Sequence, residues 1–258
     1  MIPKKIHYYW FGGKPEPENV RKCIESWKKF LPDYELYRWD ESNYDINKNQ
    51  YMSDAYKEKK WAFVSDYCRL DVVYTHGGIY LDTDVEVVRS FNELLNEKMF
   101  CGFEIRDPKG IKKGQIVEMS VNFGLGYGAE QGHPIIREML DLYKKLNFYT
   151  PNNTLNLVAC PRYQTQILCK HGLTANNKTQ RFENGIAFSP EYFCPQSNLT
   201  NEMLCLTSNT YSIHHFSRTW SQYGLQTKIR NKLIKFIGFH MADIATRIMF
   251  LPKKILLK

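Results

Sequence analysis

The sequence predicts an α/β fold, in which helices pack on the faces of a β-sheet. The chain has 258 residues, enough for one substantial α/β domain or two small ones. Hydrophobic residues make up 43% and charged residues 24%, which is ordinary for a globular protein with a buried core. The chain also opens with a strand, a helix and a second strand, an order typical of a parallel sheet covered by helices.

The opening strand covers residues 6–10, a continuous run of apolar and aromatic side chains that ends before Gly12 and Gly13. Residues 17–30 then predict a helix, because apolar side chains recur there at helical spacing. These side chains are Val20, Cys23, Ile24 and Trp27. Residues 34–39 alternate between inward and outward positions and predict the second strand.

The clearest helix covers residues 60–75. An apolar stripe follows one of its faces, formed by Phe63, Tyr67, Leu70 and Tyr74. Asp66 and Arg69 stand one turn apart on the neighbouring line, so they can form an intrahelical ion pair or share a buried polar role. Their place beside the stripe favours the buried role. Gly77 and Gly78 end the helix, since glycine readily takes the left-handed conformation needed there.

Residues 79–81 form a short buried strand that leads directly into Asp82-Thr83-Asp84, and residues 85–88 continue as a strand. We expect later strands at 99–104, 121–124, 185–188 and 211–215. We expect helices at 135–146, after Pro134, and at 161–170. Residues 106–118 read as a polar loop.

Asp82 and Asp84 are the first candidate functional residues. Two carboxylates at positions i and i+2 where a strand ends can converge on one hard cation such as Mg²⁺ or Mn²⁺, which favours oxygen ligands. Such a cation can bridge two phosphates and neutralise charge on a departing diphosphate. A D-x-D pattern is common by chance, and a polar turn with two exposed acids is the plain alternative.

The context of this pair is more specific. Asp66-x-x-Arg69 followed by Gly77-Gly78-Ile79-Tyr80-Leu81-Asp82-Thr83-Asp84 resembles the sugar-binding D-x-D region of glycosyltransferase family 32. It is also similar to the glucosyltransferase domain of large clostridial toxins. The opening residues 2–13 resemble the family's first strand, and Trp39-Asp40 the end of its second. The match runs in order over roughly residues 1–220.

This resemblance implies a GT-A fold with a single Rossmann-like mixed sheet flanked by helices. It implies a nucleotide-diphosphate sugar donor, with UDP favoured over GDP, a divalent metal (Mn²⁺ or Mg²⁺), and retention of anomeric configuration. The acceptor would be a glycan or a lipid-linked sugar, in the synthesis of bacterial capsule or another surface polysaccharide. The loop 106–118 would cover the site when the donor binds, unless it is a plain surface loop.

The resemblance also implies roles for particular residues. The catalytic residues would be Asp82, Asp84 and Arg69. The residues that bind the donor would be Trp10, Asp66, Arg69, Tyr80, Asp82, Asn122 and Trp220. Two aspartates and a late histidine would hold the metal, and we assign that histidine to His215 rather than His214. Core packing is the alternative for Trp10, a turn hydrogen bond for Asn122, and an ordinary histidine pair for 214–215.

The net charge of +8 is concentrated at the C-terminal end. From Lys228 onwards the chain has eight basic residues and one acid, Asp243, or 8 − 1 = +7, which leaves +1 for residues 1–227. A nucleic-acid partner is therefore not expected. We divide the chain into a transferase domain, 1–226, and a basic amphipathic tail, 227–258, that would lie on an anionic membrane or pack as a helix on the domain.

The seven cysteines are dispersed, without metal-binding spacing, which indicates reduced thiols. We see neither a signal sequence nor a run of 18 apolar residues, so we expect a cytoplasmic protein peripheral to the inner face of the cell membrane. Two other functions remain open. The Asp82-Thr83-Asp84-Val85 stretch also fits the nucleophile motif of haloacid-dehalogenase-type phosphatases, although its position along the chain does not. A non-catalytic module that binds nucleotide sugars is the second alternative.

Overall fold

A computed structural model describes residues 1–105, 119–198 and 202–217, together with Leu233 and Met241. The main elements are β1 (Lys5–Tyr9), α1 (Glu18–Phe30), β2 (Glu35–Trp39), α2 (Gln50–Lys57), α3 (Trp61–His76), β3 (Gly78–Tyr80), β4 (Val85–Val87), β5 (Met99–Gly102), β6 (Tyr127–Ala129), α4 (Pro134–Tyr143), α5 (Cys160–Lys170), β7 (Gln180–Phe182), β8 (Gly185–Phe188), α6 (Pro190–Phe193) and β9 (Ser212–His214). Short 3₁₀ turns lie between them, including η1 (Ile46–Lys48), η2 (Asn92–Leu94) and η4 (Phe123–Leu125).

Seven strands form one mixed sheet in the order β2-β1-β3-β6-β5-β8-β7. The strands β2, β1 and β3 are parallel, β6 is antiparallel to both of its neighbours β3 and β5, and β5 is parallel to β8. A separate ribbon pairs β4 with β9 in antiparallel fashion. The predicted mixed sheet flanked by helices is therefore confirmed.

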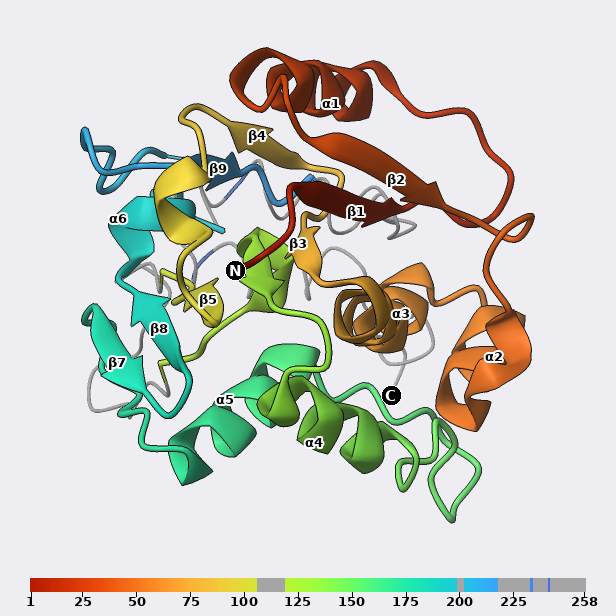
Figure 1. The fold of residues 1–258 in the computed structure, drawn as a ribbon. Coiled ribbons are helices and arrows are strands. Elements are labelled where there is room, and N and C mark those ends of the chain that lie inside the picture. Colours follow the sequence, from red (N-terminus) through yellow and green to blue (C-terminus); the bar gives the residue numbers. More distant parts are fainter. Residues whose placement is uncertain (106–118, 199–201, 218–232, 234–240, 242–258) are drawn as a thin grey trace.

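The sheet has a hydrophobic core on each face. Tyr9, Tyr80 and Tyr127 point into the core beneath α2, α3 and α4, whereas Ile6 and Ile79 point into the core beneath α1 and the β4–β9 ribbon. This alternation follows from the two-residue repeat of a strand. In Figure 1, α3, α4 and α5 lie on one side of the strands, toward the lower right, and α1 with the β4–β9 ribbon lies on the other, toward the top.

Helix α1 holds β4 in place, directly after the Asp84 position. Trp27 is fully buried, and its indole N–H donates a hydrogen bond to the Val85 carbonyl oxygen at 2.7 Å. The Ser26 hydroxyl accepts from the Val87 backbone N–H at 2.9 Å. Truncating a buried tryptophan costs about 3–5 kcal/mol of stability. Packing and hydrogen bonds from α1 therefore hold β4, the strand that directly follows Asp84.

The two glycines after α3 allow the sharp entry into β3. Gly77 has φ +62° and Gly78 has φ +110°, values that side chains rarely tolerate. A Cβ atom on Gly78 would also lie 2.7 Å from the Lys5 carbonyl oxygen on the neighbouring strand. The predicted glycine termination of this helix is confirmed.

Some predicted elements differ from the structure. Residues 121–124 are not a strand: only Val121 makes a bridge, to Phe103, and Asn122 then caps the 3₁₀ turn η4. The Asn122 side chain accepts from the Gly124 N–H, and this local hydrogen bond competes successfully with strand pairing. Four elements of the structure, α2, β6, β7 and the short α6, are not among those predicted.

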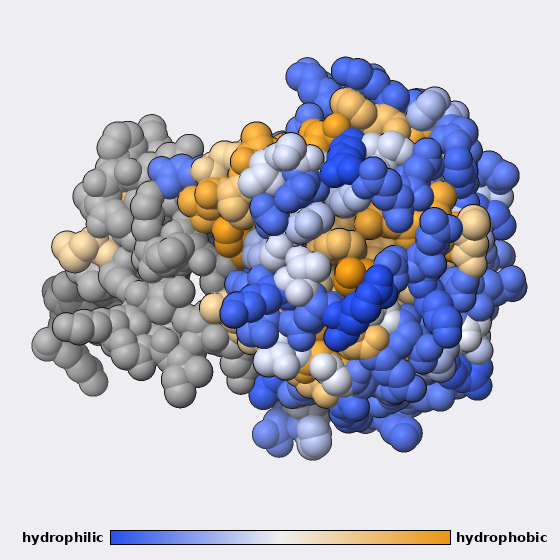
Figure 2. Space-filling model, turned by 60° about the vertical axis from the view of Figure 1, so that its left-hand side comes forward, coloured by the Kyte–Doolittle hydropathy of each residue, from blue (hydrophilic) through white to orange (hydrophobic). Residues whose placement is uncertain are grey.

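The surface drawn in Figure 2 is mainly hydrophilic, with smaller hydrophobic patches. Met203, Leu204 and Leu206 are large exposed hydrophobic residues in the segment before β9. Within the described ranges, no helix has the length and apolar character needed to cross a membrane. All seven cysteines are free thiols. The predicted boundary near residue 226, the amphipathic tail and the loop 106–118 lie outside the described residues.

Candidate metal and donor site

Asp82 and Asp84 lie where β3 leaves the sheet and the chain turns into β4. The Leu81 N–H donates to the His7 carbonyl oxygen at 3.1 Å, which continues the pairing of β3 with β1 by one residue. The Val85 N–H then donates to the Asp82 carbonyl oxygen at 3.0 Å and closes a turn. Both carboxylates therefore emerge at the carboxyl end of the central parallel strands, the edge where ligands bind in open α/β sheets.

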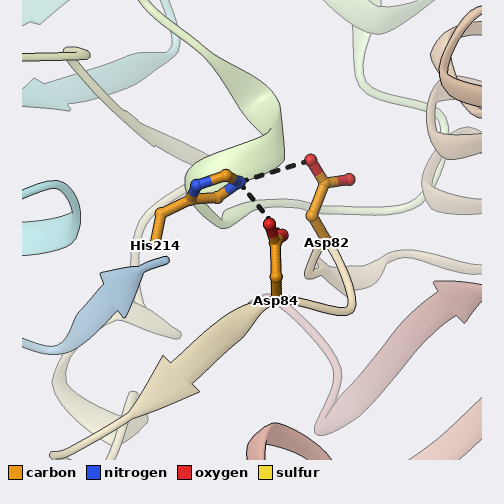
Figure 3. A group of neighbouring side chains, drawn as sticks. All are labelled: Asp82, Asp84 and His214. Carbon is orange, nitrogen blue, oxygen red and sulfur yellow. Dashed lines mark ion pairs between the residues drawn. The ribbon is translucent and has the colours of Figure 1, made fainter. Parts of the chain in front are cut away.

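His214 completes a group of three side chains that could together hold a metal ion. Its Nε2 atom lies 3.3 Å from Asp84 Oδ1 and 3.6 Å from Asp82 Oδ2. One ligand atom from each of the three residues lies within 4.8 Å of the others. Figure 3 shows the imidazole pointing at both carboxylates. Neighbouring ligands on one Mg²⁺ ion are about 3 Å apart, so a small closure of this group would fit a divalent cation.

The prediction that His215 supplies the third ligand is not what the structure shows. His214 pairs with Val85 in the β4–β9 ribbon, so its side chain projects toward the acidic pair. His215 projects to the other side, where its Nε2 atom lies 2.9 Å from Glu86 Oε2. The reason is the alternation of side chains along a strand, which puts adjacent residues on opposite faces.

The backbone after β9 also holds Asp84. The His215 N–H donates to the Asp84 carbonyl oxygen at 3.0 Å, and the Ser217 N–H donates to Asp84 Oδ2 at 2.7 Å. Asp84 Oδ1 faces His214. The backbone therefore fixes Asp84 Oδ2, and Asp84 Oδ1 faces the space between the Asp82 and His214 side chains. Metal-binding carboxylates are commonly oriented by such hydrogen bonds.

Asp82 is oriented by residues behind it. The Tyr80 hydroxyl donates to Asp82 Oδ1 at 2.7 Å, and Arg69 Nη2 lies 3.5 Å from the same oxygen. The Arg69 guanidinium stacks over the Tyr80 ring at 4.8 Å from the ring centroid. Tyr80 is only 2% exposed, so it supports Asp82 from within the core. Its predicted contact with the donor stays a prediction.

The electrostatics of the group favour a charged state. Burial alone would raise the pKa of Asp82, but the Arg69 guanidinium and His214 together lower it. Burial alone would lower the pKa of His214, but the carboxylates of Asp84, Asp82 and Glu104 raise it. Without a cation, the nearby carboxylates thus favour the protonated form of the His214 imidazole.

Asp66 and Arg69 form the buried polar pair that the sequence favoured. Arg69 Nη2 lies 3.1 Å from Asp66 Oδ1, and both residues are at most 5% exposed. Burial raises the pKa of Asp66 to about 6, against the opposing effects of Arg69 and the Cys160 thiol. Arg69 also donates to the Ser65 hydroxyl and carbonyl oxygens, so its guanidinium is held in one position between Asp66 and Asp82.

Gly124 leaves room for the side chains of Asp82, Asn122 and Arg69 to approach one another. A Cβ atom at this position would lie 2.2 Å from Asp82 Oδ2, 3.0 Å from Asn122 Oδ1 and 3.1 Å from Arg69 Nη1. The three polar atoms therefore surround one point that only glycine leaves open. Asn122, predicted from the resemblance, lies at the site. Gly124 was not predicted, because a glycine in a short glycine-rich run gives no signal of a close approach.

The other predicted residues are less directly placed. Trp10 follows β1 at the same edge of the sheet, partly buried, and its indole N–H donates to the Lys14 carbonyl oxygen at 2.5 Å. Trp220 lies outside the described residues. Glu104, a buried acid beside Asn122, was missed, because it read as the last residue of a strand.

Comparisons with known proteins agree with this chemistry. A family model described as a glycosyltransferase sugar-binding region containing a DXD motif matches residues 17–101. An uncharacterized glycosyltransferase of Acanthamoeba polyphaga mimivirus is 25% identical over 252 residues, which cover 92% of this chain and 92% of that protein. Inositol phosphoceramide mannosyltransferase 3 of Schizosaccharomyces pombe is 29% identical over 150 residues, which cover 54% of this chain and 36% of that protein.

Among solved structures, the PaToxG glycosyltransferase aligns with 66% of this chain and 69% of its own, at 23% identity and a TM-score of 0.47. The galactosyltransferase LgtC, solved with donor and acceptor sugar analogues, aligns with 78% of this chain and 91% of its own, at 13% identity and a TM-score of 0.36.

Proposed function

We propose that this chain is a glycosyltransferase family 32-like protein with a GT-A fold, a proposal supported by the match of residues 17–101 to a sugar-binding region containing a DXD motif. It transfers a sugar from a nucleotide-diphosphate sugar to a glycan or lipid-linked acceptor. The observation that carries the proposal is the group formed by Asp82, Asp84 and His214 beside Arg69. Two carboxylates and an imidazole suit Mn²⁺ or Mg²⁺, and a cationic guanidinium beside them suits an anionic ligand.

The metal is held by Asp84, Asp82 and His214 in this proposal. When bound, the ion supplies neutralisation of charge on the departing nucleoside diphosphate. The protein's own part is positioning. Asp66 and Ser65 fix the Arg69 guanidinium, which donates hydrogen bonds to hydroxyl or phosphate oxygens of the donor. Trp10 stacks on the donor base, as the family resemblance implies.

We propose retention of anomeric configuration through attack on the same face that the diphosphate leaves. A double displacement needs a carboxylate free to attack the anomeric carbon. Glu104 is a buried carboxylate near the site, but both of its oxygens accept hydrogen bonds from asparagine amides. This engagement disfavours Glu104 as a nucleophile and supports the same-face route.

The donor and acceptor are finer parts of the proposal. We favour a UDP-sugar over a GDP-sugar, following the family resemblance. One relative carries the name of an inositol phosphoceramide mannosyltransferase, which supports a lipid-linked acceptor and keeps GDP-mannose among the donors to be tested. Synthesis of a bacterial capsule or surface polysaccharide is the setting we propose.

We further propose that the chain works in the cytoplasm, at the inner face of the cell membrane, through the basic segment 227–258. The charge of +7 and the interspersed apolar residues of that segment support binding to anionic lipid. Sedimentation of the full chain with vesicles tests this point. Binding to phosphatidylglycerol vesicles but not to phosphatidylcholine vesicles is expected, and equal recovery with both would contradict it.

The main experiment is a thermal-shift and donor-hydrolysis screen. UDP-glucose, UDP-galactose, UDP-N-acetylglucosamine and GDP-mannose are each tested with and without Mn²⁺, since a ligand that binds only the folded state raises apparent stability. A donor that stabilises the protein only with Mn²⁺ and slowly releases nucleoside diphosphate supports the proposal. Release of phosphate from aryl phosphates would point to a phosphatase, and binding without turnover to a non-catalytic module.

A further inference from the structure

Helix α5 holds the backbone on both sides of Asn122, and it has no role in the function proposed above. The Phe123 N–H donates to Gln164 Oε1 at 3.0 Å, and the Val121 N–H donates to Thr165 Oγ1 at 3.0 Å. Residues 164 and 165 are adjacent in the middle of α5. Two neighbouring side chains of one helix therefore receive the two backbone N–H groups that flank Asn122.

The extended backbone directs these N–H groups toward α5. Asn122 has an extended conformation, and its own N–H donates to the Gly102 carbonyl oxygen of β5 at 3.0 Å. Successive N–H groups of an extended chain point to opposite sides, so those of Val121 and Phe123 point away from β5. Both residues are fully buried, and a buried N–H without an acceptor costs free energy. The acceptors on α5 are therefore needed where they stand.

The direction of each acceptor is fixed. A backbone N–H can only donate, so the amide oxygen of Gln164 must be the atom that faces Phe123. Gln164 is 2% exposed, and its Nε2 atom has no hydrogen-bond partner among the residues that the structure describes. The contact with Phe123 is thus the polar interaction that this buried amide makes there. The Thr165 hydroxyl donates to the Pro161 carbonyl oxygen at 2.7 Å, which leaves a lone pair for the Val121 N–H.

The segment that α5 holds lies directly against the acidic pair. The Asp82 N–H donates to the Gly124 carbonyl oxygen at 3.3 Å, and a Cβ atom on Gly124 would lie 2.2 Å from Asp82 Oδ2. Both the backbone and the carboxylate of Asp82 therefore contact this glycine. The Leu125 carbonyl oxygen accepts from the Ser212 hydroxyl at 3.4 Å, and Ser212 begins the strand that carries His214. Residues 121–125 thus contact two of the elements that supply the candidate metal ligands.

The same helix also reaches the buried ion pair of the site. Cys160 is the first residue of α5, and a hydrogen bond from its thiol acts to lower the pKa of Asp66, against the larger effect of burial. Cys160 and Gln164 are four residues apart, so they lie on one face of the helix. One face of α5 therefore contacts both the Asp66–Arg69 pair and the segment that supports Asp82.

We propose that Gln164 and Thr165 are positioning residues of the metal site. They hold residues 121–125 so that Gly124 keeps the Asp82 carboxylate beside Asp84 and His214. Their action passes through the backbone, without contact to the cation or the donor. The inference rests on the proposed function, because it concerns the cation that the function requires.

The test measures Mn²⁺ affinity from the electron paramagnetic resonance signal of the free ion. Thr165→Val keeps the size of the side chain and removes the acceptor, so Mn²⁺ affinity falls about tenfold, the size expected when a group behind a metal ligand is lost. Gln164→Leu removes the second acceptor and has an effect of about the same size. Thr165→Ser keeps the hydroxyl, so its affinity returns to near the wild-type value.

A second measurement needs no metal. In the metal-free protein, amide hydrogen exchange over residues 119–125 becomes faster in Thr165→Val and returns to the wild-type rate in Thr165→Ser. Leu168→Ala is the matched control, because Leu168 is fully buried in the same helix and has no part in these hydrogen bonds. The cavity lowers the melting temperature of the control, but its Mn²⁺ affinity stays at the wild-type value.

Several results would overturn the inference. Wild-type Mn²⁺ affinity in folded Thr165→Val and Gln164→Leu proteins would show that the two hydrogen bonds do not position the site. An equal loss in Thr165→Ser would show that the hydroxyl is not the cause. An equal loss in Leu168→Ala would show that general weakening of α5 explains the effect. If the wild type bound no Mn²⁺, the proposed function would fall together with this inference, whereas the variants can overturn the inference alone.

Discussion

Replacing Gly124 by alanine tests the convergence of polar groups at the site. The added Cβ would lie 2.2 Å from Asp82 Oδ2, against an ordinary contact of about 3.4 Å or more between such atoms. The Asp82 carboxylate must therefore move by about 1 Å, away from its Tyr80 hydroxyl donor or out of reach of His214. Gly124 has no positive φ, so backbone strain does not contribute.

A displacement of this size is large for a metal ligand. We expect Gly124→Ala to weaken Mn²⁺ binding about 10- to 100-fold. We also expect it to lower donor turnover by about 100-fold, since a misplacement near 1 Å costs roughly that factor in rate. Isothermal titration with Mn²⁺ measures the first effect, and release of nucleoside diphosphate measures the second.

The matched control is Gly172→Ala. Gly172 has φ +91° and nothing within 4 Å of an added Cβ, so its substitution strains the backbone without touching the site. It should lower stability by about 1 kcal/mol and leave Mn²⁺ affinity unchanged. If a folded Gly124→Ala protein bound Mn²⁺ and hydrolysed donor like the wild type, the position of the Asp82 carboxylate against Gly124 would not matter for the metal, and the prediction would be wrong.

Three further predictions concern groups around the site and the core. Tyr80→Phe removes the hydroxyl that donates to Asp82, so urea unfolding should show a loss of about 1–2 kcal/mol, and an unchanged midpoint would contradict the contact. Burial lowers the pKa of His7 from 6.5 to about 4. Between these pH values the unfolded chain binds a proton at His7 and the folded chain does not, so stability falls as pH drops from 6.5 to 4. This loss amounts to about 3 kcal/mol, and a His7→Gln variant should show a flatter pH dependence of its urea midpoint. Hydrogen bonds that the His171 ring donates to the carboxylates of Glu183 and Glu138 raise the pKa of His171 above 6.5, so the stabilisation from His171 is complete below pH 6.5 and disappears as pH rises through the raised pKa. His171→Ala should therefore destabilise at pH 6 but not at pH 9, and equal losses at both values would argue against these ion pairs.

The sequence was most informative where periodicity and chemistry coincided. The apolar stripe of α3 predicted that Asp66 and Arg69 lie beside the core. Gly77 and Gly78 predicted where α3 ends and where β3 begins, and therefore where Asp82 and Asp84 follow. These features are local, so they are readable without tertiary contacts. Helix α2 also has a readable signal that the prediction missed, because Asn49 caps it by accepting from the Met52 N–H, and its buried residues Tyr51, Met52 and Ala55 recur at helical spacing.

Other features depend on contacts that are distant in sequence. Which of His214 and His215 faces the acidic pair depends on the register of β9 against β4, since shifting a strand by one residue exchanges its faces. Glu104 has no local pattern that marks it as buried, because its partners Asn122 and Asn198 lie 18 and 94 residues further along the chain. Such residues become visible only when the fold brings their partners together.

The most direct measurement is the binding of Mn²⁺ to the wild type and to Asp84→Ala, His214→Ala and His215→Ala, followed by the electron paramagnetic resonance signal of the free ion. Binding should be lost in Asp84→Ala, weakened at least about tenfold in His214→Ala, and unchanged in His215→Ala. Loss of binding in His215→Ala together with normal binding in His214→Ala would contradict the assignment of His214 as the metal ligand. Normal binding in Asp84→Ala would show that the proposed metal site does not exist.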